Sequence, residues 1–170
     1  MSMGFINSIR NLMTDPRAEI TEVFQFEVDY RLPFQQQVAA GNYDYVNHTI
    51  HMSETRWLNE HYGRVGVAQF ESALVRFTKG VFSRHEADEL VQDIDGTSWE
   101  HSPIEPLLAF GARFPDEQRK GNIVAFNARA TQSAVAFLGQ GGPWQRKLDL
   151  IEGKIVLPCT DIRYLVVCRR

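Results

Sequence analysis

Residues 83–115 read SRHEADELVQDIDGTSWEHSPIEPLLAFGARFP and contain the two clearest helical patterns of the chain. In the first pattern, Ser83 and Glu86 form a capping box ahead of apolar residues at helical spacing. In the second, Ser102 is expected to cap the helix ahead of a proline at the first helical position, and Pro115 ends or kinks the helix. The stretch therefore predicts two central helices joined by a short connection.

Strand patterns lie on both sides of this helical stretch. Apolar residues that alternate or run continuously predict strands at residues 22–30, 65–79, 123–130, 134–138, 147–151, 154–157 and 162–168. A short helix is expected after Pro33, and an irregular connection at residues 42–50. Strands grouped in this way favour an α+β fold, with a mainly antiparallel sheet packed against the two central helices.

The chain begins with a separate amphipathic pattern. Residues 4–13 carry apolar side chains at helical spacing, and Pro16 ends the pattern because the residue before a proline avoids the helical region. We expect a short N-terminal amphipathic helix as an arm over residues 1–16, and a single α+β domain over residues 17–170. The apolar stripe of the arm can dock on its own domain or on a partner chain.

Composition excludes several classes of protein. The chain has 170 residues, 44% of them hydrophobic and 23% charged, as in globular domains of ordinary composition. The two cysteines, Cys159 and Cys168, form no C-x-x-C motif, which favours reduced thiols in the cytoplasm over a disulfide scaffold or a zinc site. A net charge of −3 argues against a dedicated nucleic-acid-binding protein. The sequence predicts no membrane span, no metal site and no cofactor.

Three stretches resemble a family of small hypothetical proteins of bacteria and phages. Residues 39–47, AAGNYDYVN, are similar to an AAGNYDWVN element of that family. Residues 107–120, LLAFGARFPDEQRK, are similar to its LLAFGxxYPDxQRK element, and residues 163–167 to its C-terminal YRFLAV strand. No activity is known for the family. One departure is Asn127, which stands where the family pattern has a serine.

Three histidines are weak candidates for catalysis. His48, His51 and His61 lie close together in the sequence, among carboxylates that could complete a site for a divalent ion. The i, i+3 spacing of His48 and His51 places both on one side only in a helix. Because Thr49 and Ile50 favour strand or loop, exposed polar histidines are the competing interpretation.

Four other residues are candidates for a binding surface. Asp116, Gln118 and Arg119 follow the second central helix and could form the polar floor of a site. Trp144 lies in a loop, where aromatic side chains are favoured at binding surfaces. The competing account is structural: Asp116 caps a turn, and Arg119 is buried and paired with carbonyl or carboxylate oxygens.

These observations leave three functional hypotheses. The first is a non-enzymatic protein-interaction module, as a component of a phage or bacterial assembly, with partner binding or self-association through the N-terminal helix. The second is a metal-assisted hydrolase that uses His48, His51 and His61. The third is a small-molecule-binding domain with a pocket between the sheet and the helices. The absence of any catalytic motif favours the first.

Overall fold

The computed structural model describes residues 17–52, 65–78, 84–92, 94, 97–129, 134–142, 144–152 and 162–169. The predicted N-terminal helix, the strand predicted at residues 154–157, Ser83 and His61 lie outside this part of the chain.

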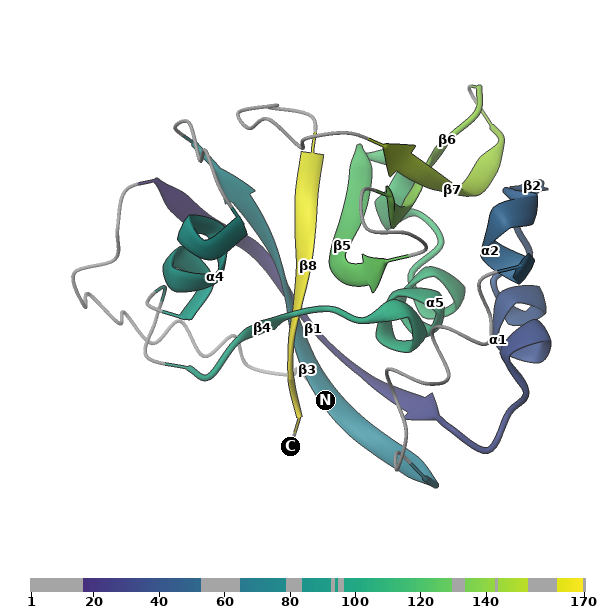
Figure 1. The fold of residues 1–170 in the computed structure, drawn as a ribbon, viewed down its shortest axis with the longest axis horizontal. Coiled ribbons are helices and arrows are strands. Elements are labelled where there is room, and N and C mark those ends of the chain that lie inside the picture. Colours follow the sequence, from purple (N-terminus) through teal and green to yellow (C-terminus); the bar gives the residue numbers. More distant parts are fainter. Residues whose placement is uncertain are drawn as a thin grey trace, which may run out of the picture.

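One eight-stranded sheet runs through the described residues (Figure 1). Its strands are β1 (Ala18–Asp29), β2 (Tyr45–Val46), β3 (Val67–Phe77), β4 (Glu100–His101), β5 (Asn122–Arg129), β6 (Ala134–Gln140), β7 (Arg146–Glu152) and β8 (Ile162–Arg169). The strand order is β1-β3-β8-β5-β6-β7-β2, and β4 pairs with β8 off this path. The pairs β5–β8 and β2–β7 are parallel, and the other pairs are antiparallel.

The helices are short. They are α1 (Phe34–Ala40), α2 (His48–Met52), α4 (Arg84–Gln92), α5 (Ile104–Arg113) and the 3₁₀ helix η1 (Glu117–Arg119). No helix in the described part of the chain has the length and apolar content needed to cross a bilayer.

The last strand, β8, lies in the interior of the sheet and is buried on both faces. Figure 1 shows β8 in yellow, with α4 on one side of it and α5 with α1 on the other. Tyr164 and Val166 belong to one hydrophobic core, and Leu165 and Val167 belong to a second. Because successive residues of a strand point to opposite faces, the two cores lie on opposite faces of one sheet.

Each central helix covers a different face. Leu107 and Leu108 of α5 pack in the core that contains Leu165. Leu90 and Val91 of α4 pack in the core that contains Tyr164. A sheet that is apolar on both faces needs cover on both, which is why the two helices separate.

The expected fold, a mainly antiparallel sheet packed against two central helices, is therefore wrong. The sheet is mixed and dominates the described part of the chain, in which 47% of the residues are strand and 28% are helix. The two helices do not form a layer together, because consecutive strand residues such as Val124 and Ala125 both need apolar cover and face opposite ways.

The chain passes from one face of the sheet to the other beside β8. Here β4 pairs with the end of β8, while β5 pairs with its beginning. The Ser102 N–H donates to the carbonyl oxygen of Leu165 at 3.0 Å. Asn127 of β5 binds the segment that passes between the two faces, residues 101–102. Its side-chain amide donates to the His101 carbonyl at 2.8 Å, and its backbone N–H donates to the Ser102 carbonyl at 3.2 Å. Asn127 thus has a structural role in this chain.

Candidate functional site

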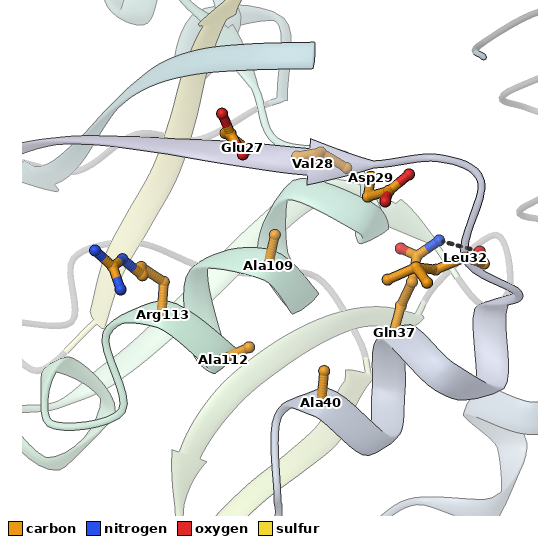
Figure 2. A pocket seen from close by; sticks show the side chains of 9 residues that line it. All are labelled: Glu27, Val28, Asp29, Leu32, Gln37, Ala40, Ala109, Ala112 and Arg113. Atoms are coloured by element: carbon orange, nitrogen blue, oxygen red, sulfur yellow. Dashed lines mark hydrogen bonds between the residues drawn. The ribbon is translucent and has the colours of Figure 1, made fainter. Parts of the chain in front are cut away.

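A pocket of about 280 Å³ lies where the end of β1 faces α1 and α5 (Figure 2). Its lining comes from these three elements and from the turn between β1 and α1. The lining residues are Glu27, Val28, Asp29, Leu32, Gln37, Ala40, Ala109, Ala112 and Arg113. The pocket is open to solvent and mostly apolar, as is typical of ligand and partner sites.

Small side chains on the two helices create this hollow. Ala40 ends α1, and Ala109 and Ala112 lie on α5 (Figure 2). Their methyl groups leave room that larger residues would fill. Leu32, which is 40% exposed, adds apolar surface at one end. The Gln37 amide donates to the Leu32 carbonyl at 2.9 Å and joins α1 to the preceding turn.

The charged groups around the pocket differ in what they contact. Asp29 accepts two hydrogen bonds from the Arg31 guanidinium at 2.8 Å each, and this contact lowers the pKa of the Asp29 carboxyl to about 2. Glu27 accepts a hydrogen bond from the Gln69 amide. Arg113 is exposed at the C-terminal end of α5, and no hydrogen bond or ion pair within the described residues engages its guanidinium.

The predicted site residues of η1 do not line this pocket. Asp116 and Arg119 form an i, i+3 ion pair at 2.6 Å, with 77% and 42% of their side chains exposed. The expectation that Arg119 is buried is therefore wrong. Asp116 precedes η1 but makes no side-chain capping hydrogen bond. The pair faces solvent, and its use in binding stays a prediction.

The other two predicted binding residues lie in different environments. Gln118 is 1% exposed, and its amide donates to the Gly139 carbonyl at 2.8 Å. Its side-chain oxygen accepts from Arg146 Nε at 3.2 Å. Gln118 is thus part of the packing between η1 and β6. Trp144 is 79% exposed and lies outside the pocket lining.

The histidine cluster is only partly described. His48 and His51 are both exposed on α2, so the expectation of an irregular connection at residues 42–50 is wrong at this point. A helix does place the two histidines on one side. No group of three or more histidine, cysteine or carboxylate side chains that could hold a metal ion occurs among the described residues. His61 lies outside them.

Arg146 of β7, which the sequence analysis missed, connects that strand to the ends of α1 and α5. Its guanidinium donates to the Gly41 carbonyl at 2.6 Å and to the Gly111 carbonyl at 2.7 Å, at the C-terminal ends of α1 and α5. A cation near helix C-termini is favoured by the helix dipole. The same group lies 5.2 Å from the centroid of the Tyr43 ring. A single arginine in a strand carries no sequence signal for such a role.

The AAGNYDYVN stretch, residues 39–47, accordingly connects α1 to the strand β7 through hydrogen bonds. Asp44 accepts a hydrogen bond from the Arg146 N–H at 2.7 Å, and Asn47 donates to Asp149 at 2.8 Å. The Asn47 side-chain oxygen also accepts from the Thr49 N–H at 3.0 Å, at the start of α2. Polar residues of this motif therefore have structural partners.

A second buried arginine also lay outside the predicted sites. Arg163 is 5% exposed, and its guanidinium contacts the Glu117 carboxylate at 3.1 Å as well as the Glu117 carbonyl oxygen. The Lys120 ammonium contacts Glu117 at 2.7 Å and Glu22 at 3.4 Å. This cluster connects β8, η1 and β1, and it supports the architecture of the sheet.

Comparisons with protein-family models, with curated proteins and with solved structures found no match to this chain. The resemblance of its three motifs to the bacterial and phage proteins therefore stays a prediction.

Proposed function

We propose that this protein is a non-enzymatic interaction module that binds another protein through the pocket between β1, α1 and α5. The observation that carries the proposal is an open, largely apolar pocket beside an arginine that has no partner among the described residues. Apolar hollows with one or two polar groups at the rim are typical of recognition sites.

The size of the pocket favours a protein partner over a small molecule. Ligand pockets usually have volumes of about 300–1,000 Å³ and enclose most of the ligand. At about 280 Å³, this pocket is at the lower end of that range, and it is open to solvent, so it would enclose little of a drug-sized ligand. It suits one or two side chains presented by a partner. The metal-assisted hydrolase has less support, because His48 and His51 are exposed and no described residue group completes a metal site.

Three further predictions belong to this proposal. Residues 1–16 contribute to partner binding or self-association as an amphipathic arm, and the module belongs to a phage or bacterial assembly, which the motif resemblance supports. The low cysteine content supports a cytoplasmic location.

A pull-down from the native host with matched variants tests this function. Ala40→Leu fills the pocket, whereas Ala39→Leu adds the same side chain at an exposed position of α1 outside the pocket lining. We expect a partner that wild-type protein and Ala39→Leu retain and that Ala40→Leu loses. Deletion of residues 1–16 should weaken capture. A partner that Ala40→Leu retains at full strength would contradict the proposal.

A further inference from the structure

The strand β1 ends the sheet and has one open edge. β3 pairs with one edge of β1, and no described strand pairs with the other edge of β1. The Tyr30 N–H donates to the Gly66 carbonyl at 2.8 Å, so these opposed residues form a hydrogen-bonded pair. Hydrogen-bonded and non-hydrogen-bonded pairs alternate along antiparallel strands. Glu27 and Asp29 therefore direct their N–H groups, and Glu27 its carbonyl, toward the open edge.

These same residues line the pocket. Glu27, Val28 and Asp29 form one wall of it, and α1 with α5 forms the other (Figure 2). The pocket is thus a groove between the open edge of a sheet and a helix. Extended peptides bind such places by adding a strand: main-chain hydrogen bonds supply affinity, and pockets for alternate side chains supply specificity.

We propose, on the basis of the function proposed above, that β1 accepts an extended segment of the partner protein as an additional strand at Glu27 and Asp29. One apolar side chain of the segment enters the hollow formed by Ala40, Ala109 and Ala112. A carboxylate of the segment, from a side chain or from the chain terminus, pairs with the Arg113 guanidinium.

Charge complementarity selects an acidic segment over a basic one. Arg113 is the cation in the pocket lining, and no described residue neutralises it. Asp29 is already bound by Arg31. The Glu27 carboxylate accepts a hydrogen bond from the Gln69 amide. Because successive side chains of a strand point to opposite faces, the Glu27 side chain projects from the face opposite to that of the buried Val28. Neither carboxylate therefore competes for the ligand position beside Arg113.

The test uses short random peptides displayed as a library and selected against the full chain. We expect the selected peptides to share an apolar residue near an acidic residue or a free C-terminus. Binding should fall about tenfold or more with Arg113→Gln, which removes a charge-assisted hydrogen bond. Arg119→Gln is the matched control, because Arg119 is equally on the surface but lies outside the pocket lining.

A backbone test separates strand addition from simple side-chain binding. Methylation of alternate peptide nitrogens removes the donors that would meet β1, so one of the two alternate methylation patterns should abolish binding. The other pattern modifies nitrogens that face away from β1 and should be tolerated. Ala40→Leu should weaken binding, and Ala39→Leu should not.

The outcomes distinguish this inference from the proposed function. If selected peptides lose binding to Ala40→Leu but tolerate both methylation patterns, strand addition is wrong and the pocket function remains. If the selected peptides are basic, the pairing with Arg113 is wrong and the pocket function likewise remains. If no peptide is selected, or if Ala40→Leu has no effect, both are wrong. A wild-type dimer that Ala40→Leu dissociates would place a second copy in the groove and overturn the inference.

Discussion

The Tyr43 hydroxyl fills the space that a side chain at residue 111 would need, because a Cβ built on Gly111 would lie 2.2 Å from it. The Tyr43 ring likewise lies 2.0 Å from the corresponding position on Gly41. Arg146 covers the ring and binds the carbonyl groups of both glycines. The aromatic ring is thus held between the ends of α1 and α5, and this contact fixes the two helices that form one wall of the pocket.

Alanine at residue 111 should therefore destabilise the protein. We expect Gly111→Ala to cost about 1–3 kcal/mol in the free energy of unfolding, as overpacking of a filled site does. Tyr43→Phe removes a buried hydroxyl that has no hydrogen-bond partner within the described residues, so it should be neutral or stabilise by up to about 1 kcal/mol. Chemical denaturation of both variants and of the double variant measures these effects. Equal costs of Gly111→Ala with and without the hydroxyl would contradict the contact.

Two arginines near η1 should differ sharply in their contribution to stability. Arg163 is buried against Glu117, and Arg163→Ala leaves that carboxylate without its buried partner. Loss of one member of a buried pair costs about 3–5 kcal/mol when the other charge is left uncompensated. Because Lys120 still contacts Glu117, we expect the lower end of that range. Arg119 is exposed, so Arg119→Ala should cost about 0.5 kcal/mol or less. Urea denaturation of the two variants compares them, and a larger loss for Arg119 would refute this assignment.

The Asp29–Arg31 pair should titrate at low pH. The guanidinium lowers the Asp29 pKa from its ordinary value of 3.8 to about 2. Since the folded pKa is below the unfolded one, the contribution of the pair to stability is present above about pH 4 and is lost as pH falls toward 2. NMR titration of the Asp29 carboxyl should report this pKa. Arg31→Gln should raise the pKa toward the ordinary value, and Arg119→Gln should leave it unchanged.

An Asp29 carboxyl that titrates at the ordinary value in the wild-type protein would contradict the pairing. It would also leave Asp29 able to attract a cation at the pocket, which would weaken the argument for an acidic partner segment.

Local patterns in the sequence predicted individual elements well. The pattern beginning at Ser102 and ending at Pro115 matches α5, and the apolar runs match β1, β3, β5, β6, β7 and β8. The capping detail at Ser102 was wrong, since its hydroxyl contacts the Pro103 carbonyl and makes no cap hydrogen bond. Apolar periodicity depends on neighbouring residues, so it identifies an element without fixing its place in the fold.

The sequence patterns do not specify the long-range arrangement of the strands and helices. The parallel pairing of β8 with β5 brings Ile162 beside Asn122, and nothing in either strand specifies the other as its neighbour. The pocket was missed for the same reason. Ala40 belongs to the AAGNYDYVN motif and Ala109 and Arg113 to the LLAFGARFPDEQRK motif, but neither motif specifies the other as its neighbour. They meet because α1 and α5 pack together beside β1. Within the motif at residues 107–120, the predicted binding residues were Arg119 and its neighbours, whereas the pocket is lined by residues earlier in the same motif.

Amide chemical-shift mapping with a peptide selected as above tests the central claim most directly. We expect the largest changes at the N–H groups of Glu27 and Asp29 and along Ala109 and Ala112, because these residues line the groove. Changes concentrated at Arg119 and Trp144, with the groove unaffected, would place the binding surface elsewhere and contradict the account.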